Sequence, residues 1–156
     1  MALGADAARR VALCDRAGRR TGGQLQTIAA PGGSEVFSEP AVWTNRTGTT
    51  YVFATTGAGT AAYRLGSDRR LSIAWQDGTP GTSPVIAGGL LYVYDEVHGA
   101  LLVRNPVTGR QLGSLPVGQG HWNSPIVVGG RIILPVGDAN AHDTTGTLDI
   151  YHLPGR

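Results

Sequence analysis

The sequence predicts an all-β fold built from repeated four-stranded antiparallel sheets. The segment GTSPVIAGGLLYV, which starts at Gly81, recurs 41 residues later as WNSPIVVGGRIIL. A fainter copy, SEPAVWTNRTGTTYVF, places Pro40 44 residues before Pro84. Apolar and polar residues alternate within each copy, and no segment keeps a 3.6-residue period. A repeat of about 40–45 residues made of short strands is the spacing of a β-propeller blade.

The repeat also predicts where the strands lie. The blade at 81–117 is expected to have strands at 83–87, 90–94, 100–105 and 111–115, with Gly88 and Gly89 forming a two-residue hairpin turn. The preceding blade, at 36–76, is expected to have strands at 40–44, 50–55, 61–65 and 71–75. Each of these blades is therefore a four-stranded meander.

An incomplete blade is expected at each end of the single domain formed by residues 1–156. Strands at 11–15 and 24–28 would belong to a partial blade at 10–30, and strands from 123, at 132–136 and at 147–153 to another at 122–154. The sequence thus predicts a partial propeller of about three blades. Such an array leaves exposed sheet edges, which a longer propeller, or copies that assemble to complete a ring, would cover.

The segment from Val103 to Gly113, VRNPVTGRQLG, resembles the tryptophan-docking repeat A-x-D-x-x-T-G-x-x-x-W of the PQQ-like (quinoprotein-like) propeller superfamily. Thr108 and Gly109 match this pattern, whereas Val103, Asn105 and Gly113 replace its alanine, aspartate and tryptophan. Trp75 closes an outer strand where the docking tryptophan would stand. The resemblance implies a propeller fold, and one fold hosts many activities.

The superfamily includes outer-membrane assembly scaffolds and quinone-dependent dehydrogenases. For the dehydrogenases the resemblance implies a vicinal cysteine pair, a calcium ion held by carboxylate and amide oxygens, and an aspartate base. Cys14 is the single cysteine, which excludes the pair. Pyrroloquinoline quinone (PQQ) or calcium is expected only in a complete propeller, so no cofactor is expected here. The resemblance also implies a periplasmic or extracellular location, although the first 20 residues lack the order of a signal peptide.

Charge and hydropathy exclude two classes of partner. The formal net charge is +2, and the basic excess is confined to a short arginine cluster at 9–20 without interleaved aromatic residues. A nucleic-acid interface would need a broader basic stripe. No apolar run approaches the roughly 18 residues of a membrane-spanning helix. The sequence therefore predicts neither nucleic-acid binding nor a membrane span.

Two loops carry the richest chemistry. In a four-stranded meander, the loop between the second and third strands and the loop between blades leave on the same face, and both are long in the last blade. One holds His121, Trp122 and Asn123, which we expect to bind a ligand or a partner protein. The alternative is that Trp122 packs on the adjacent blade and His121 bonds a loop carbonyl.

The second loop, at 137–146, contains six residues more than the repeat requires. Asp138, Asn140, His142 and Asp143 offer oxygen and nitrogen donors that could hold calcium or zinc. The alternative is an Asx-rich turn that satisfies its own backbone. In the preceding blade, Asp95, Glu96 and His98 occupy the equivalent loop, which we interpret as solvated.

No catalytic constellation can be assembled from local spacing. The sequence therefore favours a non-catalytic propeller segment that acts as a binding or scaffold module through this loop face. The alternative hypothesis is a portion of a quinone- or metal-dependent oxidoreductase, which the family resemblance suggests.

Overall fold

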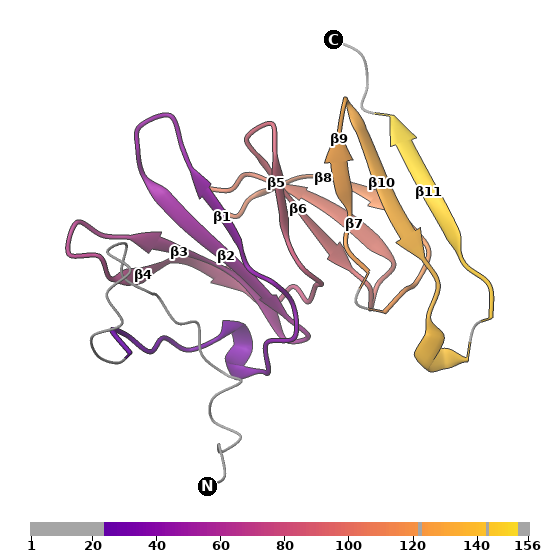
Figure 1. Cartoon of the computed structure of the whole chain (residues 1–156), viewed down its shortest axis with the longest axis horizontal. Coiled ribbons are helices and arrows are strands. Elements are labelled where there is room, and N and C mark those ends of the chain that lie inside the picture. Colours follow the sequence, from indigo (N-terminus) through magenta and orange to yellow (C-terminus); the bar gives the residue numbers. More distant parts are fainter. Residues whose placement is uncertain (1–23, 122, 143, 153–156) are drawn as a thin grey trace, which may run out of the picture.

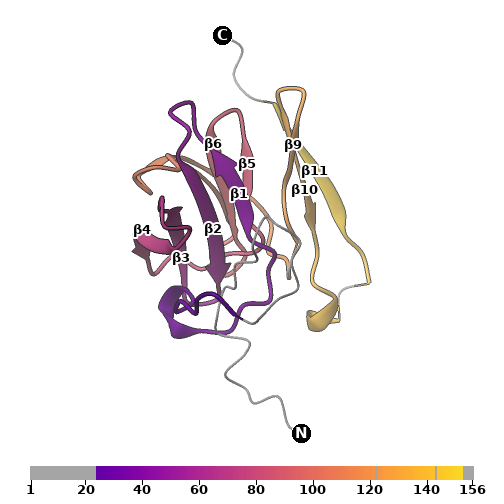
Figure 2. The same cartoon turned by 60° about the vertical axis from the view of Figure 1, so that its left-hand side comes forward.

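A computed structural model describes residues 24–121, 123–142 and 144–152. These residues form three antiparallel sheets that lie side by side, with the second between the other two (Figures 1 and 2). The predicted all-β class is confirmed. Within the described ranges, no helix combines the length and the apolar character needed to cross a membrane.

The first sheet has the order β1-β2-β3-β4, formed by β1 (Ala41–Thr44), β2 (Thr50–Thr56), β3 (Gly59–Leu65) and β4 (Leu71–Asp77). The second has the order β5-β6-β7-β8, formed by β5 (Val85–Ala87), β6 (Leu90–Asp95), β7 (Ala100–Arg104) and β8 (Gln111–Pro116). Both are the expected meanders, and their strands begin and end within two residues of the predicted positions.

The third sheet contains β9 (Ile126–Val128), β10 (Arg131–Val136) and β11 (Thr147–His152), with β10 in the middle. Short 3-10 helices precede β1 (η2, Pro31–Gly33) and follow β10 (η3, Ala139–Ala141). The hairpin prediction holds, because Gly88 and Gly89 have φ angles of 58° and 77°. These are the left-handed values that a two-residue turn of this kind requires.

The core consists of two layers between the sheets and a third apolar cluster on the outer face of the first sheet. Successive side chains of a strand point to opposite faces, so β6 serves both layers. Leu91 and Val93 pack on Tyr51 and Phe53 of the first sheet. On its other face, β6 packs Tyr92 and Tyr94 with residues of the third sheet, and this second layer consists of Tyr92, Tyr94, Leu101, Ile132 and Leu134.

The prediction of a strand at 24–28 is wrong. This segment instead crosses the outer face of the first sheet, where Ile28 packs on the apolar cluster that contains Tyr63. The side-chain amide of Gln26 donates to Leu71 O at 2.8 Å and accepts from Leu71 N at 2.8 Å. These bonds occupy the backbone groups that strand pairing would use. The predicted strand at 11–15 lies outside the described residues.

The outer face of the third sheet is apolar and exposed. Ile126 and Val128 are 56% and 60% exposed. They stand 41 residues after Val85 and Ala87, which pack against the third sheet. A face that is partly buried in the second sheet is therefore open in the third. Self-association that would cover it stays a prediction.

Trp75 docks on the neighbouring sheet, as its position at the end of an outer strand predicts. Its Nε1–H donates to Pro106 O at 2.9 Å, in the turn between β7 and β8. Asn105 accepts bonds from the backbone N–H groups of Val107 and Thr108 at 2.9 and 3.0 Å. Asn105 therefore organises this turn in place of the aspartate of the docking pattern.

Candidate functional site

The loops of the three sheets gather on one face of the molecule, which we call the loop face. It carries η2, η3, the links between sheets and the β6–β7 turn, at the bottom of Figure 1. The tight β5–β6 and β9–β10 hairpins lie at the opposite end. This arrangement agrees with the meander geometry expected from the repeat. Binding residues are commonly found on such loops, held by a rigid scaffold.

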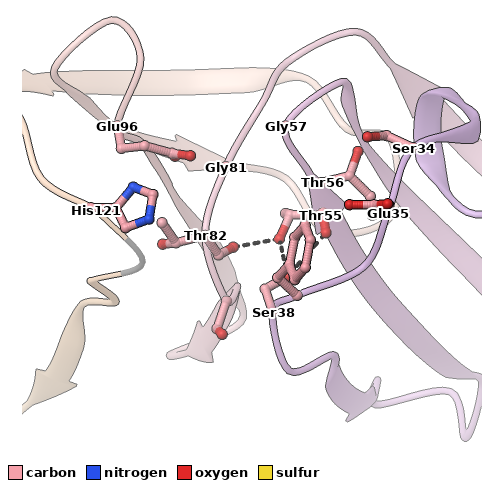
Figure 3. A pocket seen from close by; sticks show the side chains of 12 residues that line it. Ser34, Glu35, Ser38, Thr55, Thr56, Gly57, Gly81, Thr82, Glu96 and His121 are labelled. Atoms are coloured by element: carbon pink, nitrogen blue, oxygen red, sulfur yellow. Dashed lines mark hydrogen bonds between the residues drawn. The ribbon is translucent and has the colours of Figure 1, made fainter. Parts of the chain in front are cut away.

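A cavity of about 320 Å³ opens on the loop face between the first and second sheets (Figure 3). One wall carries Glu96, His121 and Thr82, and the other carries Ser34, Glu35 and Thr56. The cavity therefore draws on loops that are distant in the sequence. The complete lining is Ser34, Glu35, Phe37, Ser38, Thr55, Thr56, Gly57, Gly81, Thr82, Ser83, Glu96 and His121.

The two long loops predicted to be neighbours do meet. Asn140 Nδ2 donates to His121 Nε2 at 2.7 Å, and Gly120 forms an isolated bridge with Gly137. Asn123 does not face the cavity, because its amide donates to Pro135 O at 2.9 Å. Of the predicted binding residues, His121 lines the cavity, and Trp122 lies outside the described residues.

Two of the predicted metal ligands, Asp138 and Asn140, belong to a turn. Asp138 accepts backbone bonds from Asn140 and Ala141 at 2.8 and 3.2 Å, as in the Asx-rich alternative. His142 has a φ of 64° in this loop. Within the described residues, no three His, Cys, Asp or Glu side chains are grouped so that they could hold a metal ion. Asp143 lies outside them, and the metal site stays a prediction.

The solvated interpretation of the β6–β7 loop is wrong for one of its carboxylates. Asp95 is 5% exposed and accepts from His98 N at 3.0 Å, and its other oxygen lies 2.8 Å from His98 Nδ1. These bonds close the turn. Glu96 instead faces the cavity, where its Oε2 is buried and receives no hydrogen bond from the described residues.

A hydroxyl network forms the floor of the cavity and joins two sheets. Ser38 Oγ donates to Thr55 O at 2.9 Å and lies 3.0 Å from Thr55 Oγ1. Thr55 Oγ1 in turn donates to the carbonyl of Thr82. The hydroxyl of Thr82 itself is buried, and the described residues offer it no partner. Thr82 and Glu96 thus place two unsatisfied oxygens at one cavity.

Burial and neighbouring carboxylates raise the pKa values of two groups, Glu96 on this wall and Tyr94 close to it. Burial raises the pKa of Glu96, and the charge of Asp95 raises it further, whereas its own backbone N–H and His121 act in the opposite direction. Burial also raises the pKa of Tyr94 to about 12, with further contributions from Glu96, Asp138 and Asp95.

Replacing Glu96 with glutamine should stabilise the protein at neutral pH. Because the pKa of Glu96 is raised on folding, its contribution to stability is fully present below the unfolded pKa and is lost as pH rises through the folded pKa. We expect Glu96→Gln to gain up to about 1 kcal/mol at pH 7, the lower end of the cost of an unsatisfied buried group.

Urea unfolding at about pH 4 and pH 7 measures this effect, and the gain should disappear at the lower pH, where the unfolded carboxyl is largely protonated. Glu39→Gln is the matched control, because Glu39 is exposed and lies outside the cavity. Equal effects of the two variants at both pH values would show that Glu96 pays no burial penalty.

Neither a family model nor a curated protein sequence matches this chain. Among solved structures, a europium-containing methanol dehydrogenase is similar to it, with a TM-score of 0.58 and 17% sequence identity. The chain therefore has the fold of a partial β-propeller. The likeness covers 79% of this chain and 24% of that chain, so this partial propeller spans about a quarter of the dehydrogenase. At this identity the likeness shows the fold and not the activity.

The sequence pointed to the His121 loop but missed Thr82 and the wall at 34–38. Thr82 stands next to the repeated Ser-Pro entry, and comparing its position across the copies could have marked it.

Proposed function

We propose that this chain is a non-catalytic binding module that receives a small polar ligand in the cavity of its loop face. The observation that carries this proposal is the pair of buried oxygens, Thr82 Oγ1 and Glu96 Oε2, to which the described residues supply no hydrogen bond. Buried polar groups in folded proteins are almost always paired. Two exceptions on one cavity wall therefore favour a partner that enters from outside.

The size and lining of the cavity support this function. Its volume of about 320 Å³ lies at the lower end of the range for small-molecule sites. Nucleophilic catalysis would need a hydroxyl activated by a base. The hydroxyls of Ser38 and Thr55 are instead bound to each other and to backbone carbonyls. These groups hold the two sheets together at the cavity floor.

The test is a thermal-shift screen with amines, polyols, carboxylates and sugars. A ligand that binds the folded state raises the melting temperature in a saturable way. We expect at least one class to do so, and the Thr82→Val/Glu96→Gln double variant to keep the fold by circular dichroism and lose the response. A flat response of the natural chain to all classes, or an unchanged response of the double variant, would overturn the proposal.

The alternative, a portion of a quinone- or metal-dependent oxidoreductase, is favoured by the likeness in fold to the methanol dehydrogenase. It requires stoichiometric metal or a quinone absorbance in protein purified without chelator. Elemental analysis and an absorbance scan of the same preparation separate it from the binding module. A partner protein on the loop face would be revealed by loss of its binding when His121 and Trp122 are both replaced.

A further inference from the structure

We propose that the ligand of this cavity is an organic cation whose primary ammonium group donates hydrogen bonds to the Glu96 carboxylate and the Thr82 hydroxyl. This inference rests on the proposed function and names its ligand class. It stands on three observations: the internal repeat, the unsatisfied oxygens and the charge of the lining.

The repeat shows what the position of Thr82 normally does. Three residues before its first strand, each sheet carries a polar side chain: Ser38, Thr82 and Asn123. In the first and third sheets this side chain binds the carbonyl of the penultimate residue of the second strand. Ser38 binds Thr55 O at 2.9 Å, and Asn123 binds Pro135 O at 2.9 Å. The structural role of the position is therefore to tie the entry loop to the sheet.

The second sheet departs from this pattern. Its equivalent carbonyl, that of Tyr94, accepts a bond from the backbone N–H of Thr82 at 3.0 Å. The Thr82 hydroxyl is thereby released from the structural role, and it is buried at the cavity wall, since Thr82 is 3% exposed. Glu96 is a second departure from the repeat. It directly follows the second strand of its sheet, and in the other two sheets this position is a glycine, Gly57 or Gly137. The fold therefore requires neither the unbonded Thr82 hydroxyl nor the Glu96 carboxylate.

The charge of the lining selects a cation. Glu96 and Glu35 stand on opposite walls, and among the described residues no lysine or arginine lines the cavity (Figure 3). Of the described lining residues, His121 can carry positive charge, and Asn140 is bound to its Nε2. A buried carboxylate oxygen without a donor is costly. An ammonium group supplies both the opposite charge and three N–H donors, whereas a neutral alcohol supplies one donor and an anion adds repulsion.

The experiment is an amide-resolved NMR titration with ethanolamine, ethylene glycol and glycolate, which share a two-carbon frame and differ in charge. We expect ethanolamine to shift the amide resonances of Thr82 and Glu96 and to bind about tenfold more tightly than the other two, as charge-assisted hydrogen bonds imply. Glu96→Gln should weaken ethanolamine binding about tenfold. Glu39→Gln, an exposed carboxylate outside the cavity, should leave it unchanged.

Three results would overturn the inference: no shift with ethanolamine, equal affinity for ethylene glycol or glycolate, or equal binding by the Glu96→Gln variant. The amide spectrum of each variant shows whether it remains folded, and Thr82→Val provides a second variant on the same wall. A response to a different compound class in the thermal-shift screen would leave the proposed binding function standing. If no compound class raised the melting temperature, both the proposed binding function and this inference would be overturned.

Discussion

Replacing Trp75 with alanine should lower the free energy of unfolding by about 2–4 kcal/mol, somewhat below the cost of truncating a fully buried tryptophan. Trp75 is half-buried, two residues before the end of β4, and its indole joins the first two sheets. It packs with Phe53 of its own sheet at a ring-centroid distance of 6.4 Å and reaches the β7–β8 turn of the next. The loss should therefore separate two sheets rather than perturb one strand.

Contacts of Arg104 with the indole should increase the loss of stability in the Trp75→Ala variant. Its guanidinium lies 5.1 Å from the indole centroid, donates to Gly109 O at 2.8 Å and pairs with the Asp77 carboxylate. Arg104 is 6% exposed, so its charge depends on these neighbours. Burial of Asp77 favours its protonated form, but the bonds from Arg104 and Thr79 outweigh it and hold the pKa of Asp77 below its usual value. Removing the indole exposes this ion pair to water and screens it.

Urea unfolding of Trp75→Ala measures the loss, and Trp75→Phe is the matched control. Phenylalanine keeps a ring beside Arg104 and loses the bond to Pro106 O, which is worth about 1 kcal/mol. We expect the phenylalanine variant to lie between the natural chain and the alanine variant. If alanine costs no more than phenylalanine, the indole does not join the sheets.

The sequence predicted the strands well because their signals are local. The Gly88-Gly89 turn and the alternating pattern of β6 depend on residues that are adjacent in the chain. The failure at 24–28 has the opposite cause. Gln26 reads as part of an alternating strand, but its side chain is bound to Leu71, 45 positions away. No local pattern encodes that pairing.

The candidate site was predicted only in part, for a related reason. His121 stood out because its loop differs from the other copies. Thr82 lies in a segment that matches the repeat, so its sequence does not mark it as a site residue. Its hydroxyl is recognised as unpaired only because the structure shows that the backbone N–H of Thr82 already occupies the Tyr94 carbonyl. Glu96 was interpreted as a solvated loop carboxylate, whereas its Oε2 is buried at the cavity between the first two sheets. Sites formed between repeats are therefore harder to predict than the repeats themselves.

Replacing Gly109 with alanine should cost about 2–4 kcal/mol, the combined cost of a left-handed backbone and of overpacking. Gly109 has a φ of 73°, which an L side chain rarely adopts. A Cβ at this position would stand 2.7 Å from two carbon atoms of the Trp75 ring, so the ring or the turn must move. Movement of the turn also disturbs the Gly109 carbonyl that accepts from Arg104.

Gly89→Ala separates the two causes. Gly89 has a nearly equal φ of 77°, but a Cβ there would meet no atom within 4 Å. It should therefore lose about 1 kcal/mol, the backbone cost alone. The difference between the two variants in urea unfolding isolates the contact with Trp75.

A double-mutant cycle completes the argument, because contacting residues give non-additive effects. In the Trp75→Ala background the ring is gone, so Gly109→Ala should cost no more than Gly89→Ala. Additive losses at positions 75 and 109 would mean that glycine is required by the turn and not by the docked indole. The predicted non-additivity follows from a single geometric fact, that the tryptophan of one sheet rests on the glycine of the next.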